Sequence, residues 1–156
     1  MTVSVQREPF DVTAEIARLT AGAHGVGAVA SFLGLVRDMN TGSDEAANVR
    51  AMTLEHYPGM TERALEEIVV EANGRWDLLG VRVIHRYGRL EPGDAIVLVI
   101  VASAHRGEAF SACEFIMDFL KTRAPFWKKE ETPEGSHWVD AREEDDAAAD
   151  RWPDRR

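Results

Sequence analysis

Lysine is rare in this chain and is confined to one short segment. The sequence contains fifteen arginines and three lysines, and the lysines are Lys121, Lys128 and Lys129. A lysine amine that is desolvated or close to other cations can lose its proton and act as a base or a nucleophile, whereas arginine cannot. The segment therefore indicates amine chemistry. The alternative is an exposed basic turn at the end of a helix, where positive charge is favourable.

His105 and Arg106 stand between a predicted apolar strand and a predicted helix. Free N–H groups at the start of a helix attract anions, and a guanidinium with an imidazole would complete a phosphate or carboxylate site. The alternative is that His105 only caps the helix. A continuous helix would place Lys121 roughly 22 Å from Arg106. A single ligand could then contact both Arg106 and Lys121 only if it is long. Alternatively, a second subunit could supply its own copy of one of these residues.

Other polar residues give weaker signals. Arg37 follows a predicted strand, where a lone arginine is usually a solvated charge. Glu55 and His56 precede a Tyr-Pro-Gly turn and favour a hydrogen-bonded structural pair over catalytic groups. Cys113 falls on an apolar helix stripe, which favours a core position over a nucleophile. The sequence has no metal-ligand spacing and no phosphate-loop or Gly-x-Ser-x-Gly motif, so we expect neither metal nor cofactor.

The composition is that of one globular domain with excess negative charge. Of 156 residues, 45% are hydrophobic and 29% are charged, which suits a chain that buries a core. A net charge of −9 argues against general nucleic-acid binding. One cysteine fits a reducing compartment. The N-terminus has no signal-peptide pattern and the longest apolar run, residues 95–102, is strand-sized, so we expect a cytoplasmic location.

Hydrophobic periodicity predicts the elements that must position these residues. Helices are expected over 10–19, 61–74 and 106–122, and strands over 27–36, 49–57, 81–87 and 94–104. The strand over 27–36 is expected to be buried. A tight turn over 91–94 should join the last two strands in a hairpin.

Helix ends and tertiary class follow from the same pattern. Thr61 is predicted to cap the second helix and Gly74 to end it. Phe110 and Cys113 are predicted to lie on the apolar stripe of the third. Because helices and hairpins are segregated, we expect an α+β fold with a single domain over 1–142. Residues 143–156 should form a loosely held, flexible acidic tail.

Five stretches of the sequence form a specific pattern. They are Phe32-Leu-Gly-Leu-Val-Arg37, Leu54-Glu-His-Tyr-Pro-Gly-Met-Thr-Glu62, His85-Arg-Tyr-Gly-Arg-Leu90, Ser103-Ala-His-Arg106 and Phe115-Ile-Met-Asp-Phe-Leu-Lys-Thr-Arg-Ala-Pro-Phe-Trp-Lys128. These stretches closely resemble the large, catalytic subunit of molybdopterin synthase, the MoaE family. The match runs from about residue 27 to residue 142, and its two longest runs are highly specific.

This resemblance implies an α/β hammerhead-like fold with an antiparallel or mixed sheet and two to three main helices. It implies a homodimer within a heterotetramer, in which each large subunit holds a small ubiquitin-like sulfur carrier by its C-terminal Gly-Gly thiocarboxylate tail. The implied enzyme is a transferase of molybdenum cofactor biosynthesis. It would convert cyclic pyranopterin monophosphate (precursor Z) to molybdopterin by transferring two sulfurs, which form the dithiolene.

The resemblance also implies the roles of site residues. Lys121 would be the main acid/base, or would capture the acyl group, and Lys128 would stabilise charge on the pterin. Glu130 would orient the pterin, and Arg142 would reach the neighbouring subunit's site. Arg37, His105 and Arg106 would hold phosphate and tail carboxylate. The implied substrate-contacting positions are Leu35, Val36, Arg37, His105, Arg106, Lys121, Lys128, Lys129 and Glu130.

The residues alone leave two other classes open. A sulfurtransferase could carry sulfur as a persulfide on Cys113, and Cys113→Ser would then be inactive. A non-catalytic module could bind anionic partners through the basic segment, with affinity that follows net charge and with no turnover. A phosphohydrolase has less support, because the sequence shows neither a metal set nor a nucleophile.

Overall fold

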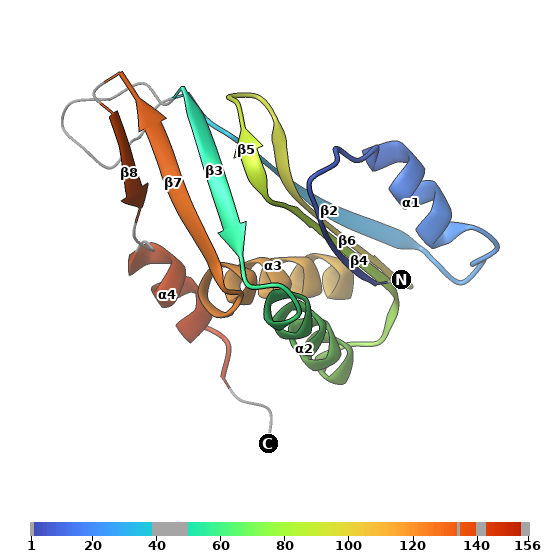
Figure 1. Cartoon of the computed structure of the whole chain (residues 1–156). Helices are drawn as coiled ribbons and strands as arrows, with labels where there is room; N and C mark the ends of the chain where they lie inside the picture. Colours follow the sequence, from blue (N-terminus) through green and yellow to red (C-terminus); the bar gives the residue numbers. More distant parts are fainter. Residues whose placement is uncertain (1, 39–49, 134, 140–142, 154–156) are drawn as a thin grey trace.

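The computed structural model describes residues 2–38, 50–133, 135–139 and 143–153 (Figure 1). Within these residues the strands form two four-stranded sheets. The first sheet has the order β1-β4-β6-β2, and the second has the order β5-β3-β7-β8. The elements are β1 (Val3–Gln6), α1 (Val12–Thr20), β2 (Ala28–Leu35), β3 (Ala51–His56), α2 (Met60–Arg75), β4 (Leu78–Arg86), β5 (Gly88–Leu90), β6 (Ala95–Ser103), α3 (Arg106–Arg123), β7 (Phe126–Thr132), β8 (Gly135–Val139) and α4 (Glu143–Asp150).

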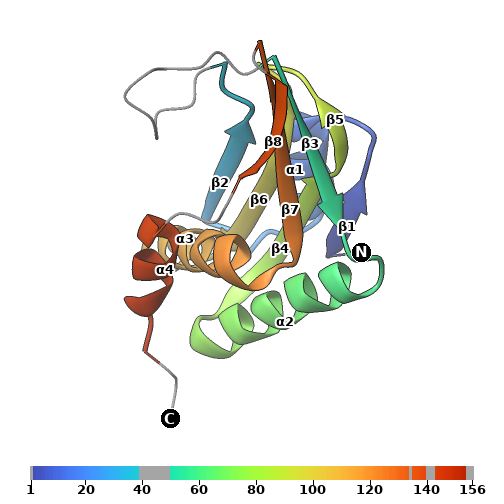
Figure 2. The same cartoon turned by 60° about the vertical axis from the view of Figure 1, so that its left-hand side comes forward.

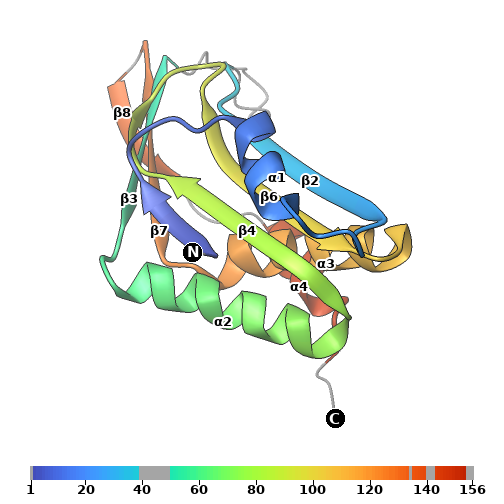
Figure 3. The ribbon, with the colours of Figure 1, turned by 90° about the vertical axis from the view of Figure 1, so that its right-hand side faces the viewer.

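Helices cover both faces of the first sheet. On one face α2 and α3 pack over a large apolar cluster that includes Val83, Val99 and Phe115. On the other face α1 covers a smaller cluster around Ile84 and Leu98 (Figure 3). Within this sheet β1 is parallel to β4, whereas the β4–β6 and β6–β2 pairs are antiparallel. The predicted α+β class and the mixed sheet are confirmed.

The β4–β6 hairpin is confirmed, although its connection also contributes β5 to the second sheet. The predicted turn closes with the Asp94 N–H donating to the Glu91 carbonyl at 2.9 Å. Gly93 has φ +91°, the left-handed conformation that the third position of a type II turn requires. One short turn therefore carries the chain back from the second sheet into β6.

The predicted burial of the strand at 27–36 is wrong for most of its side chains. Val29, Phe32, Leu33 and Leu35 are between 39% and 49% exposed in the single chain. β2 is the edge strand of the first sheet and pairs only with β6 in the described structure. An apolar run is compatible with burial on both faces, but edge position cannot be read from it.

Three helix details also differ from the predictions. Gly59, not Thr61, is the N-cap of α2, and the Glu62 carboxylate accepts a hydrogen bond from the Gly59 N–H. The helix continues through Gly74 to Arg75. Phe110 is 66% exposed, whereas Ala109, Ala112 and Cys113 are buried. The apolar pattern therefore predicts the helix and most of its buried face, but not the exposure of each apolar residue.

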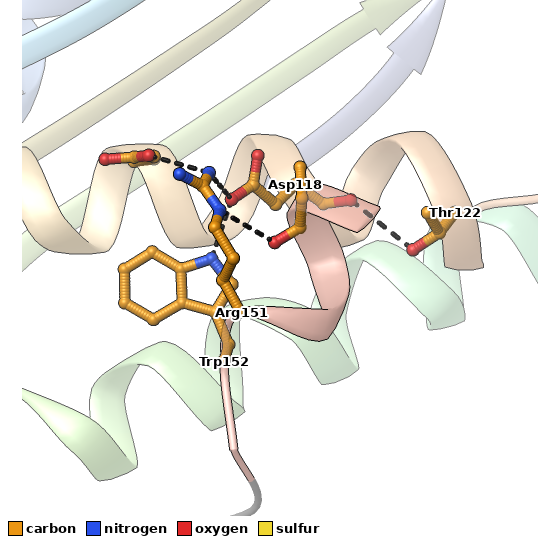
Figure 4. Close-up of polar contacts among 6 residues, drawn as sticks. Asp118, Thr122, Arg151 and Trp152 are labelled. Atoms are coloured by element: carbon orange, nitrogen blue, oxygen red, sulfur yellow. Dashed lines mark hydrogen bonds and ion pairs between the residues drawn. The ribbon is translucent and has the colours of Figure 1, made fainter. Parts of the chain in front are cut away.

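The C-terminal segment is not a loosely held tail up to residue 153. Residues 143–150 form α4, and the Trp152 ring lies edge-on to Phe115 at 5.5 Å between centroids. The Trp152 indole N–H donates to Asp118 at 2.6 Å, and Arg151 bridges Asp118 and Glu114 at 3.0 and 2.9 Å (Figure 4). These tertiary contacts to α3 stabilise a segment that its acidic composition alone would leave mobile.

The described helices include none with the length and apolar character of a membrane span.

Candidate active site

The register of the second sheet places Lys128 and Glu130 on one face. Lys128 lies opposite Leu54 and Glu130 opposite Met52 on β3. Cross-strand partners share a face, and both β3 residues are buried. The same face carries Phe126, whose ring stacks on His85 of the first sheet at 3.8 Å and 20°. Lys128 and Glu130 therefore lie on the inner face of the second sheet, the face that meets the first.

The pleat of β7 separates Lys129 from these residues. Successive side chains of a strand point to opposite faces, and Lys129 lies opposite Thr53 and Trp138. Its amine is 5.7 Å from the Trp138 ring centroid, within the range of a cation–π contact. The structure therefore does not bring Lys129 together with Lys128, although the two are adjacent in sequence.

His85 is a buried residue on which the charges of the two other lysines act. Its side chain is buried, and its Nδ1 lies 2.9 Å from the Arg86 carbonyl oxygen, so the neutral ring carries its hydrogen on Nδ1. Burial lowers the pKa of His85 to about 3, opposed by the Arg86 hydrogen bond and reinforced by the charges of Lys121, His56 and Lys128. The lysine charges that help to lower the pKa of His85 therefore come from α3 and from β7. We call Lys121 and Lys128 the lysine pair.

Neither residue types nor the resemblance predicted His85 as a site residue, although it begins one of the matching stretches. A single histidine in an alternating strand gives no signal of function. Its depressed pKa has a consequence for stability. Below about pH 6.5 the unfolded chain binds a proton at this position, whereas the folded chain binds one only near pH 3. The free energy of unfolding should therefore fall as pH decreases through this window, by about 1.4 kcal/mol per pH unit from this group.

We expect His85→Phe to remove this contribution, because phenylalanine keeps a ring against Phe126 but cannot be protonated. Urea unfolding at pH 7 and pH 5 measures it. The wild-type chain should lose about 2 kcal/mol more than the variant over this interval. The same loss in both proteins would show that His85 does not titrate as the structure indicates. His24→Phe, at an exposed histidine, is the matched control.

The end of β2 lies close to this face. Val36 is buried in a small cluster with Met52, Leu54 and Leu90. Its N–H donates to the Asp94 carbonyl at 2.9 Å, and its carbonyl accepts from Gly93 at 2.8 Å. These bonds fix the backbone at the point where exposed Arg37 follows. Because Val36 packs with Leu54 and Leu54 lies opposite Lys128, the end of β2 lies near Lys128, with Leu35 about half exposed.

His105 and Arg106 lie at a different place, the N-terminal end of α3. They line a hollow of about 400 Å³ together with Gly27, Ala104 and Gly107. A Cβ on Gly27 would be 2.2 Å from the Ala104 carbonyl oxygen, so only glycine permits this close approach. We call this the α3 hollow. His105 is the N-cap residue but makes no side-chain capping bond, which disfavours a capping role for its imidazole.

The continuous helix α3 separates the α3 hollow from Lys121. Arg106 opens the helix and Lys121 lies in its last turn, so roughly 22 Å separates them along the axis. Within one chain the charges of Lys121 and Lys128 both act on His85, whereas His105 and Arg106 lie at the other end of α3. Arg142, expected to act on a neighbouring site, lies outside the described residues.

Fold and site define an α+β protein whose two sheets meet where His85 stacks on Phe126, with the charges of Lys121 and Lys128 acting on His85. Among the described residues no group of three or more His, Cys, Asp or Glu could hold a metal ion. The sequence model described as "MoaE protein" matches residues 5–123. The chain belongs to the MoaE family.

Individual proteins agree with this assignment. The chain is 62% identical over 151 residues to the molybdopterin synthase catalytic subunit of Ralstonia nicotianae, covering 97% of this chain and 84% of that one. The structure of the molybdopterin biosynthesis MoaE protein from Burkholderia ambifaria matches with TM-score 0.81 and 54% identity, covering 97% of both chains. A complex of subunits 1 and 2 of molybdopterin-converting factor from Helicobacter pylori shares the fold, with TM-score 0.71 and 19% identity, covering 90% of this chain and 91% of that one.

Proposed function

We propose that this chain is the catalytic subunit of a molybdopterin synthase and acts in the cytoplasm. It would convert cyclic pyranopterin monophosphate to molybdopterin with sulfur from the thiocarboxylate tail of a small ubiquitin-like partner. The observation that carries this proposal is that Lys121 and Lys128, from two different elements, both act electrostatically on buried His85, which stacks on Phe126 of β7. Membership of the MoaE family supports the assignment.

The lysine pair supplies the amine chemistry of this reaction. The Lys121 amine serves as acid and base while the sulfur of the tail forms its bond to the pterin. In a second route it captures the acyl carbon as the sulfur leaves, and water later releases the tail as a carboxylate. Lys128, on the inner face, stabilises negative charge that develops on the pterin. Glu130 is buried two residues further along the same face, in a position to orient the substrate.

The α3 hollow fits the phosphate or the tail carboxylate, held by Arg106 and His105 at a helix N-terminus. Its distance from Lys121 favours contribution from a second copy of the chain. β2 offers an exposed apolar edge for that contact. Gly27, at the start of β2, lines the hollow, and Arg37 follows its end. A two-fold antiparallel contact along β2 brings the hollow of one copy toward Arg37 and the lysine pair of the other.

Reconstitution tests the proposed function. The purified chain is mixed with a thiocarboxylated ubiquitin-like partner and precursor Z, and the dithiolene product is measured. We expect product only when all three are present. Partner binding without turnover would instead support a non-catalytic module and overturn the proposal.

A persulfide on Cys113 is the main chemical alternative, and the structure disfavours it. Cys113 is buried on α3, and burial, with a smaller effect of the Glu114 charge, raises the pKa of its thiol to about 11. The thiolate that attacks sulfur donors is therefore scarce at neutral pH. We expect Cys113→Ala to keep turnover within about twofold of wild type, since it removes only a small buried side chain from the core. A loss beyond tenfold in the folded variant would restore the persulfide hypothesis.

A further inference from the structure

The turn that joins the two lysines is held from two sides by buried polar side chains. α3 ends at Arg123 and β7 begins at Phe126, so the direction of the chain between them sets how Lys121 and Lys128 face each other. The Phe126 N–H donates to the Ala124 carbonyl at 2.9 Å, which makes the turn tight. Figure 2 shows α3 leading through this turn directly into β7.

Thr61 provides the first contact. Its side chain is fully buried at the start of α2, and its hydroxyl donates to the Pro125 carbonyl at 3.0 Å. The same hydroxyl accepts from the Tyr57 N–H at 3.0 Å, which orients it. Proline has no N–H, so its carbonyl is the backbone hydrogen-bonding group that this residue offers. Thr61 thus connects the segment after β3 to the middle of the turn, 64 residues away in sequence.

His85 provides the second contact, through the stacking of its ring on Phe126. Phe126 immediately follows Pro125 and shares a strand face with Lys128. The hydroxyl of Thr61 and the ring of His85 therefore hold adjacent residues of the turn. Neither side chain belongs to the lysine segment or is expected to touch substrate.

We propose that Thr61 and His85 are positioning residues that fix the separation and orientation of the lysine pair through the turn at 124–126. This inference rests on the proposed function for its catalytic consequence. Loss of the Thr61 hydroxyl leaves the Pro125 carbonyl and the Tyr57 N–H without their shared buried partner. The turn then shifts toward other partners, and a displacement of about 1 Å at a reacting group can cost about a hundredfold in rate.

The test compares Thr61→Val, which keeps the shape but loses the hydroxyl, with Thr61→Ser, which keeps the hydroxyl. Thr132→Val is the matched control, because Thr132 is also buried and donates to a carbonyl, that of Gly135, at the opposite end of β7. We expect Thr61→Val to lower kcat by about ten- to a hundredfold with a smaller change in KM. Thr61→Ser and Thr132→Val should stay within about threefold of wild type.

A second readout does not require turnover. Reductive methylation with ¹³C-formaldehyde labels the three lysines and the N-terminus, and NMR follows the titration of each methylated amine. A change in the separation of the lysine pair alters the repulsion between their charges, so both titration midpoints should shift in Thr61→Val. Lys129, on the opposite face, is the internal control and should not change.

The two readouts separate failure of this inference from failure of the proposed function. If wild type and Thr61→Val show equal kcat and equal titrations, the inference is wrong and the function stands. If wild type makes no product, the function is wrong, and the NMR titration still decides the positioning role. Should Thr61→Val not fold, His85→Phe and His85→Ala form a second pair. His85→Phe keeps the ring contact and should match wild type, whereas His85→Ala should show both changes, and equal behaviour of the two would overturn the inference.

Discussion

Replacing Lys121 by alanine is expected to lower kcat by about a thousandfold, the size of a lost acid–base or nucleophilic group. Lys121→Arg should be nearly as inactive, because arginine keeps the positive charge but cannot release a proton at neutral pH. Product formation in the reconstituted reaction, at saturating precursor Z and partner, measures both variants. The partner should still bind, since the change removes one amine at the end of α3 and not the surrounding fold.

Lys129→Ala is the comparison for this experiment. It removes the same charge from the same segment, but its side chain lies on the opposite face of β7, over Trp138. We expect it to lose less than about tenfold. Equal losses in Lys121→Ala and Lys129→Ala would mean that the segment acts only through its net charge, as in a non-catalytic anion-binding module. Near-normal turnover in Lys121→Ala would remove the amine mechanism altogether.

Mixed dimers should show whether the α3 hollow serves the neighbouring copy. Arg106→Ala is expected to lower kcat/KM by about ten- to a hundredfold, because it removes charge-assisted hydrogen bonds to an anion. A dimer with one Lys121→Ala subunit and one Arg106→Ala subunit retains one site with both residues intact if Arg106 acts across the interface. We expect such a dimer to recover about half of the wild-type rate.

Two affinity tags on the two variants allow the mixed dimer to be purified in sequence and assayed alone. Dimers with Lys121→Ala under both tags are the control and should stay inactive. If Arg106 and Lys121 serve the same site within one chain, the mixed dimer has no intact site. Activity no higher than that of the Arg106→Ala parent would therefore place the α3 hollow in the site of its own chain.

Features that depend on neighbours in sequence could be predicted from the sequence by itself. The confinement of lysine to residues 121–129 predicted the segment for the proposed amine chemistry, and both members of the lysine pair lie in that segment. Helical periodicity placed Cys113 in the core, and Pro-Gly chemistry predicted the turn that closes at Asp94. The helix from Arg106 predicted, through its length alone, that His105 and Arg106 lie far from Lys121. Helix periodicity, turn geometry and helix length depend on residues that are close in sequence, so residue type and spacing are enough to predict them.

Only the tertiary structure decided which of these residues meet. The alternation of β7 divides adjacent lysines between two faces, and the register against β3 determines which face is inner. His85 and Thr61 reach the turn after α3 from positions tens of residues away. Likewise, β2 is exposed because it is an edge strand, and the described part of the acidic C-terminal segment, residues 143–153, packs on α3 through Trp152. Such contacts arise from strand order, register and helix packing, which join segments whose pairing no short-range pattern in the chain specifies.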